Sequence, residues 1–111
     1  MMIDSTNFFP QVLQAVPSLS SSASDKYKVY AYFNDGSVRC FDAAPLIKHG
    51  TVFQPLADIN VFRSAMTVLN NTVAWDLSGK RDEYDCIDLD PEALFACPEV
   101  PDPLDERHSV N

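Results

Sequence analysis

The sequence predicts a small α+β domain: an antiparallel sheet built from hairpins, with two or three short helices in a single layer against it. Three features indicate this class. Apolar and polar residues alternate in short runs that flank turn-forming residues, which is typical of hairpins. Aspartates precede short segments with helical spacing, where they can cap a helix. Finally, 111 residues of which 46% are hydrophobic suit one domain with one core.

The first third of the chain is expected to form one strand and then a hairpin. Residues 11–16 are apolar enough for a short strand, which Pro17 and a serine-rich loop end. Residues 27–33 alternate and are rich in aromatic residues, which favours a strand. The Asn-Asp-Gly sequence at 34–36 tolerates positive φ and leads into a second strand at 37–41. A two-residue turn and a three-residue turn with a bulge both fit this hairpin.

Two short helices are expected next. Asp42 can cap a helix over residues 43–48, with Gly50 placed to end it in the left-handed conformation. Asp58 similarly precedes a helical turn at residues 59–64.

A second hairpin follows. Residues 65–69 and 72–75 are strand candidates, and Asn70 and Asn71 between them tolerate the backbone of a tight turn. The polar residues 76–85 predict an exposed loop.

The last predicted elements are a strand at 86–89 and a helical turn at 91–95, with Asp90 as N-cap and Pro91 at the first helical position. Beyond Cys97 the chain has three prolines and little to bury, which predicts a loosely attached tail. The expected organisation is therefore an N-terminal extension at 1–10, a single α+β domain at 11–97 and an acidic, flexible tail at 98–111.

One hydrophobic core is expected from the apolar residues that face one side of each element. If these residues were exposed, too large an apolar surface would remain in contact with water. They are Val29, Ala31, Phe33, Val38, Cys40, Phe53, Leu56, Phe62, Val73, Trp75, Ile87, Leu89 and Leu94.

The charge and the cysteines narrow the function classes. Eight basic and 16 acidic residues give a net charge of −8, which disfavours direct binding to nucleic acid or to an anionic membrane. Ten of the acidic residues lie in residues 82–106, which contain no basic residue.

The cysteines form neither an even disulfide set nor a C-x-x-C pair, so we expect reduced thiols and a cytoplasmic protein without a membrane span. The three cysteines are Cys40, Cys86 and Cys97.

No catalytic, cofactor-binding or metal-ligating residue is expected. His49 follows a predicted helix and His108 lies in the predicted tail, so neither indicates a nucleophile with its base. The acidic residues of loop 76–85 do not have the spacing of a calcium loop. A stacking platform for single-stranded nucleic acid would need basic surroundings, and only Lys28 and Arg39 lie near the candidate aromatic residues in sequence. These aromatic residues are Tyr30, Tyr32, Phe41 and Trp75.

An ordered set of short motifs carries a family resemblance. It comprises the aromatic strand at 27–33, Asp35-Gly36, Phe41-Asp42, Pro45-Leu46, Phe53 with Pro55-Leu56, Phe62, Trp75 and residues 88–94. In this order and spacing, over residues 11–96, the chain resembles family 2442 of the domains of unknown function, a bacterial family. The resemblance implies a small α+β fold and no established activity. Members often lie beside family 4160 of such domains, which has prompted a toxin and antitoxin interpretation.

The chain departs from that family in three places. The serine-rich connection before Tyr27 is longer than in many relatives, and loop 76–85 replaces a compact turn. The helix-turn-helix segment that some members carry is missing, which argues against direct operator binding.

The resulting hypothesis is a small protein-binding module, an antitoxin-like or accessory partner of an adjacent small protein. A basic surface on the partner would dock on the acidic C-terminal third, with Asp102, Asp105 and Glu106 as the docking residues. One alternative is a small enzyme that uses carboxylates with Tyr30 or Tyr84. Another is a transcriptional regulator that acts through a DNA-binding partner. Pairing of strand edges also predicts a homodimer.

Overall fold

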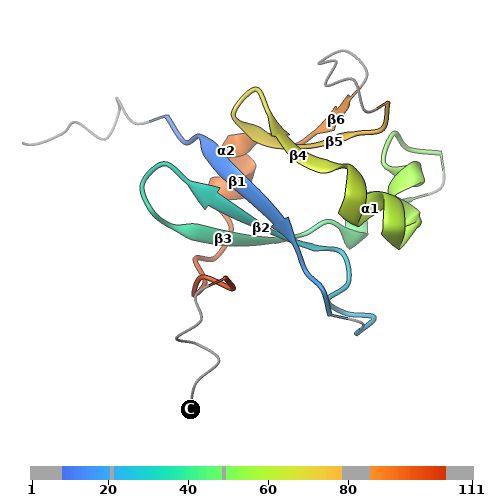
Figure 1. The fold of residues 1–111 in the computed structure, drawn as a ribbon, viewed down its shortest axis with the longest axis horizontal. Coiled ribbons are helices and arrows are strands. Elements are labelled where there is room, and N and C mark those ends of the chain that lie inside the picture. The colour runs from blue at the N-terminus through green and yellow to red at the C-terminus, as the bar shows by residue number, and fades with distance from the viewer. Residues whose placement is uncertain (1–8, 21, 49, 79–85, 105–111) are drawn as a thin grey trace, which may run out of the picture.

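A computed structural model describes residues 9–20, 22–48, 50–78 and 86–104 (Figure 1). Its strands and helices confirm the α+β class. In chain order they are β1 Val12–Pro17, β2 Lys28–Phe33, β3 Val38–Asp42, the 3-10 helices η2 Ala44–Leu46 and η3 Gln54–Ala57, α1 Ile59–Ala65, β4 Met66–Leu69, β5 Thr72–Asp76, β6 Cys86–Asp88 and α2 Pro91–Phe95.

The strands form two antiparallel three-stranded sheets, ordered β1-β2-β3 and β4-β5-β6. Each sheet consists of strands that are neighbours along the chain, as expected of hairpins. The start of β1 joins the two sheets, because Val12 N donates to Asn71 O at 2.8 Å. Of the helices, α1 packs against β4 and β5, whereas α2 packs against β3.

The turn of the first hairpin contains three residues and a bulge, which decides between the two predicted geometries. Phe33 N donates to Ser37 O at 2.9 Å, and Gly36 N donates to Phe33 O at 3.0 Å. Gly36 has a φ of 88°, which an L side chain rarely adopts. The Asp35 carboxylate accepts from Ser37 Oγ and Ser37 N, and these bonds lower the pKa of Asp35 below its ordinary value.

The second hairpin has the predicted two-residue turn. Leu69 pairs with Thr72, and Asn70 and Asn71 between them have φ values of 53° and 64°. Positive φ at both central residues matches the type I′ turn, whose twist fits antiparallel strands.

Both predicted caps of the α-helices are present. Asp58 accepts from Asn60 N and Asp90 accepts from Glu92 N, each at 3.0 Å. Such a bond satisfies one of the main-chain donors that the first helical turn leaves without a partner.

The helix predicted over residues 43–48 is shorter in the structure. Asp42 does accept from Ala44 N, but helix η2 ends at Leu46, and Gly50 lies in a later turn. Thr51 explains the early end, because its hydroxyl donates to Leu46 O at 3.2 Å and to Lys48 O at 2.9 Å. These carbonyls are therefore engaged in a turn instead of a continuing helix.

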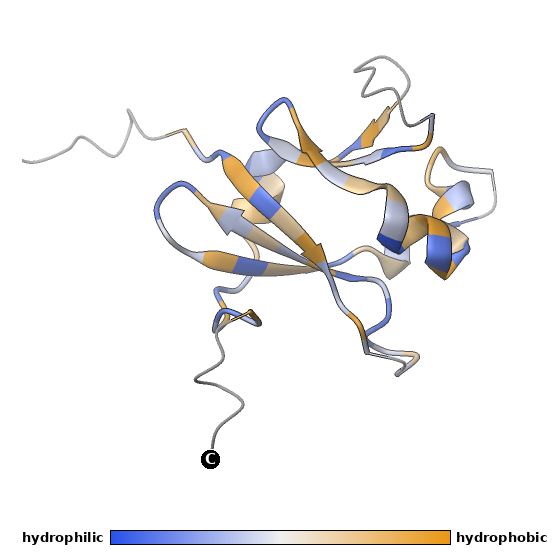
Figure 2. Ribbon diagram, viewed as in Figure 1, coloured by the Kyte–Doolittle hydropathy of each residue, from blue (hydrophilic) through white to orange (hydrophobic). Residues whose placement is uncertain are grey.

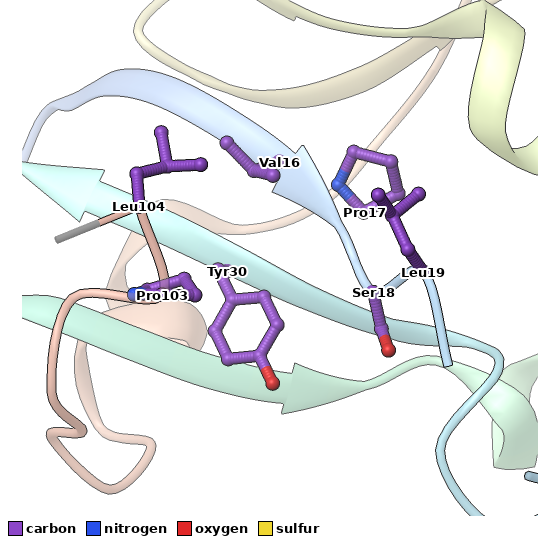
Figure 3. Close-up of a pocket in the computed structure, with 7 residues that line it drawn as sticks. All are labelled: Val16, Pro17, Ser18, Leu19, Tyr30, Pro103 and Leu104. Atoms are coloured by element: carbon purple, nitrogen blue, oxygen red, sulfur yellow. The ribbon is translucent and has the colours of Figure 1, made fainter. Parts of the chain in front are cut away.

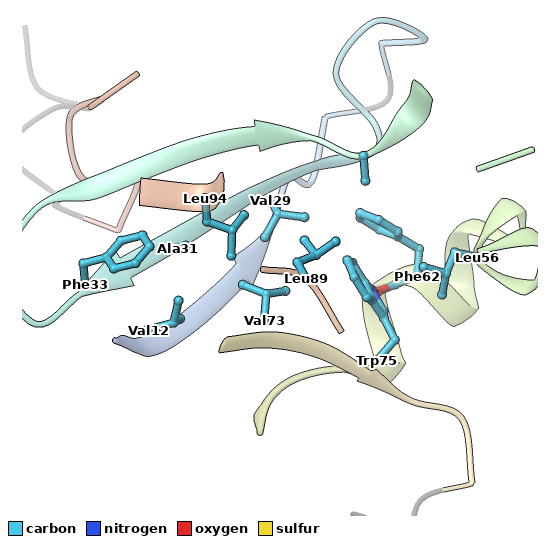
Figure 4. Packing of buried hydrophobic residues seen from close by; sticks show 11 residues of the cluster. Val12, Val29, Ala31, Phe33, Leu56, Phe62, Val73, Trp75, Leu89 and Leu94 are labelled. Atoms are coloured by element: carbon cyan, nitrogen blue, oxygen red, sulfur yellow. The ribbon is translucent and has the colours of Figure 1, made fainter. Parts of the chain in front are cut away.

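The core lies between the two sheets (Figure 4). Nine of the predicted residues belong to the buried cluster, together with Val12 and Ala43, which the sequence did not single out. Phe53 and Ile87 are half-buried against the cluster, Val38 is buried, and Cys40 is half-buried. The nine are Val29, Ala31, Phe33, Leu56, Phe62, Val73, Trp75, Leu89 and Leu94.

The first sheet has an inner face toward this core and an outer face away from it. Along β2 the inner residues are fully buried, whereas Tyr30 and Tyr32 on the outer face are half-buried. Figure 2 shows hydrophobic residues interspersed with hydrophilic ones along β1 and β3, without a strict alternation. The outer face is where the C-terminal residues of the described chain lie.

Residues 98–104, here called the C-terminal strap, follow α2 and run past β3 (Figure 1). Cys40 N donates to Pro98 O at 3.3 Å, and Val100 N donates to Val38 O at 2.8 Å, with Glu99 opposite Arg39. Residues 98–100 thus pair with the edge of β3, in the part of the chain for which the sequence predicts a loosely attached tail. An unpaired strand edge offers main-chain groups to any segment that can reach it.

Candidate docking pocket

The C-terminal strap and the first sheet together enclose a pocket on the outer face, here called the outer pocket (Figure 3). Its volume is about 250 Å³. The residues that line it come from three segments far apart in the sequence: Val16, Pro17, Ser18, Leu19, Tyr30, Pro103 and Leu104.

The floor of the outer pocket is set by the register of β1 and β2. Val16 pairs with Tyr30, which places both side chains on the outer face. Ser18 N donates to Lys28 O at 3.0 Å and continues this pairing by one residue beyond β1. The Ser18 hydroxyl then accepts from Ser20 N at 3.2 Å, and the chain turns away with Leu19 at the rim.

The wall opposite Leu19 is formed by the end of the C-terminal strap. Asp102 accepts from the Tyr32 hydroxyl of the outer face at 2.5 Å and from Leu104 N at 2.8 Å. The carboxylate thus connects β2 to the residue that forms the wall. Burial, followed by the hydrogen bond to Asp102, raises the pKa of Tyr32 above its ordinary value of 10.0.

The size and lining of the outer pocket suit an apolar side chain of another molecule. Pockets for drug-sized ligands occupy about 300–1,000 Å³, so this pocket is smaller than a typical cofactor site. Two of its apolar side chains face solvent, since Leu19 is 77% exposed and Leu104 is 53% exposed. Among the lining residues, Ser18 and Tyr30 have polar side-chain groups. Exposed apolar residues around a concavity are a common feature of interaction sites.

Only one of the three predicted docking carboxylates can be placed. Asp102 is half-buried and hydrogen-bonded, so it supports the pocket wall and is not a free charge on a tail. Asp105 and Glu106 lie outside the described residues. Substituting Asp102 would therefore alter the local structure as well as the charge.

The aromatic platform considered for nucleic acid does not assemble. Trp75 is fully buried, and Phe41 packs against the core. Tyr30 and Tyr32 alone lie on the outer face. The four rings thus belong to two separate environments.

The residues weighed for catalysis or metal binding are dispersed or not described. Tyr84, His49 and His108 lie outside the described residues, as does the acidic run at 82–85. Within the described part of the chain, no group of three or more His, Cys, Asp or Glu side chains is arranged to hold a metal ion.

Each of the three cysteines is half-buried, and none of the three is in a disulfide. Burial raises the pKa of the Cys40 and Cys97 thiols, so both favour the protonated form. Neither thiol therefore has the lowered pKa that marks a reactive cysteine.

The sequence contained one signal for the pocket that was not used. The alternation along β2 places Tyr30 and Tyr32 opposite the buried face, and two half-buried tyrosines on an outer face imply that something covers them. The segment that covers them is the C-terminal strap, and its position depends on long-range contacts.

No protein-family model, curated protein or solved structure matches this chain. The resemblance to family 2442 therefore stays a prediction. Among the described residues, no helix has both the length and the apolar character needed to cross a membrane.

Proposed function

We propose that the protein is a small protein-binding module that docks a partner at the outer pocket. The partner inserts an apolar side chain between Leu19 and Leu104 and presents basic residues around it. The observation that supports this most directly is the concave apolar surface with two solvent-facing leucines at its rim. An antitoxin-like or accessory role beside a neighbouring small protein would use such a surface.

The charge of the chain supports a basic partner. The net charge is −8, and ten acidic residues lie in residues 82–106, the part of the sequence that includes the C-terminal strap. Complementary charge accelerates association and disfavours acidic partners, while the buried apolar contact supplies most of the affinity. The charges and the apolar contact therefore each predict a different experimental result.

The test is selection of a random dodecapeptide library displayed on phage against the folded domain. We expect enriched peptides to carry a leucine-sized or aromatic residue flanked by lysine or arginine. Their affinity should fall as salt rises, because exposed charges are screened beyond about 8 Å at physiological ionic strength. Two-dimensional NMR titration with one enriched synthetic peptide should shift the amide signals of the pocket residues.

A matched pair of variants locates the binding site. Leu19→Ser removes an exposed pocket residue, and Val52→Ser removes a residue that is 70% exposed and does not line the pocket. Leu19→Ser should weaken the enriched peptide about tenfold or more, whereas Val52→Ser should leave its affinity unchanged. The proposal fails if no peptide is enriched, if acidic peptides are enriched, or if both variants bind alike.

A further inference from the structure

We infer that Tyr32 and Asp102 are positioning residues for partner binding: their hydrogen bond holds the wall of the outer pocket, although neither residue lines it. The inference deepens the proposed docking function and rests on it for the binding measurement. Its structural part, the position of the wall, is measured without any partner.

The C-terminal strap is attached to the first sheet in two different ways. From Pro98 to Val100 it pairs with β3 through main-chain hydrogen bonds. Pro101 and Pro103 have no N–H, so they cannot donate to continue this pairing. Beyond Val100, the contact of Asp102 with Tyr32 takes over the attachment.

Asp102 also sets the local conformation of the wall. Its carboxylate accepts from Leu104 N, two residues later, as in an Asx turn. The same group therefore fixes where the strap lies, through Tyr32, and how its last described residues turn, through Leu104. Packing alone is a weak restraint on Leu104, because about half of its surface faces solvent.

Tyr32 provides a firm anchor for this contact. It lies in β2, the central strand of the first sheet, between Gln14 of β1 and Val38 of β3. Its neighbours along β2, Ala31 and Phe33, are buried in the core. The packing of β2 in the core consequently fixes the position of the Tyr32 hydroxyl. The strap is positioned by its hydrogen bond to this hydroxyl.

The test compares Tyr32→Phe with Tyr27→Phe. Tyr32→Phe keeps the ring and removes only the hydroxyl that donates to Asp102. Tyr27→Phe is the matched control, because the Tyr27 hydroxyl donates to Ala57 O, away from the outer pocket. In Tyr32→Phe we expect the nuclear Overhauser contacts across the outer pocket, between Tyr30 and the strap residues Pro103 and Leu104 that line it, to weaken or disappear. Hydrogen exchange at Leu104 N should accelerate about tenfold or more in Asp102→Ala, because that variant removes the charged acceptor of this N–H.

Binding of the enriched library peptide should weaken about tenfold in Tyr32→Phe and stay unchanged in Tyr27→Phe. A second pair at Asp102 separates positioning from charge. Asp102→Asn retains a carbonyl oxygen that can accept from both donors, so it should restore the contacts between Tyr30 and the strap across the outer pocket that Asp102→Ala loses. A general loss of structure would not be corrected by the amide.

The outcomes distinguish this inference from the proposed function. Unchanged contacts between Tyr30 and the strap across the outer pocket in Tyr32→Phe overturn the inference, whatever the peptide does. Lost contacts with full peptide affinity also overturn it. If no peptide is enriched from the library, the docking function fails, and the positioning of the wall is still decided by the contacts and by hydrogen exchange.

Discussion

Replacing Trp75 by Phe should destabilise the protein more than its conservative chemistry suggests. Trp75 is fully buried, and its Nε1 donates to Phe62 O at 3.0 Å. Phe62 lies in the last turn of α1, where main-chain carbonyls have no partner within the helix. The indole therefore joins β5 to α1 by a buried hydrogen bond as well as by packing.

The expected loss has two contributions. A buried carbonyl left without its partner costs about 1–3 kcal/mol. The smaller ring also loses the transfer free energy of a few carbon-sized groups, roughly 1–2 kcal/mol. The total of about 3 kcal/mol is a large fraction of the 5–15 kcal/mol by which a domain is typically stable.

Urea unfolding followed by far-ultraviolet circular dichroism measures this loss, because Trp75 is the sole tryptophan and its fluorescence disappears in the variant. With an m-value of about 1.5 kcal/mol/M, the midpoint should fall by about 2 M. Phe9→Leu is the control: Phe9 is 69% exposed, and its substitution should change stability by less than about 0.5 kcal/mol. A loss below about 1 kcal/mol in Trp75→Phe would refute the reasoning, since the carbonyl would then have found another partner.

Four further predictions concern single features. Asp90→Ala removes the N-cap of α2 and should lower the free energy of unfolding by about 1 kcal/mol with an unchanged urea m-value; no change would mean that Glu92 N is satisfied by water. Gly36→Ala has no neighbouring atom within 4 Å to clash with, so its cost should reflect backbone strain alone, about 1–2 kcal/mol by thermal unfolding, and Gly36→Asn should recover part of it. Because the pKa of Tyr32 is raised in the folded protein, the stability that its protonated hydroxyl contributes is complete below the ordinary pKa of 10.0 and is lost as the pH rises above it. Above about pH 10, wild type should therefore lose stability more steeply than Tyr32→Phe, and parallel curves would contradict this. Self-association through strand edges predicts a dimer mass by light scattering at high concentration, and a monomer mass there would reject it.

The features predicted correctly from the sequence are those whose determinants lie within a few residues. Gly36 and the pair Asn70-Asn71 adopt positive φ because few other residues tolerate it, and the hairpins follow from them. Asp58 and Asp90 cap their helices through bonds that span two residues. Even here the sequence left two turn geometries open for the first hairpin, because the choice depends on which main-chain bonds close it.

The outer pocket could not be predicted from local sequence patterns of this kind. Its wall depends on a bond between Tyr32 and Asp102, which are 70 residues apart. The prolines and acidic residues of the strap are typical of disordered segments, and that composition favoured a flexible tail. Their pairing with β3 requires an open strand edge, which exists only after the first sheet has formed. Composition describes how a segment behaves alone and omits the surface it meets.

The bond from Val12 to Asn71 has a consequence for folding kinetics. Each sheet consists of consecutive strands, so each half of the chain can assemble from local contacts, which form quickly. The bond between Val12 and Asn71 instead closes a loop that contains more than half of the chain. Such non-local contacts slow folding more than they reduce stability. We therefore expect two nascent halves that meet late, with burial of Val12 marking the step at which they become one cooperative unit.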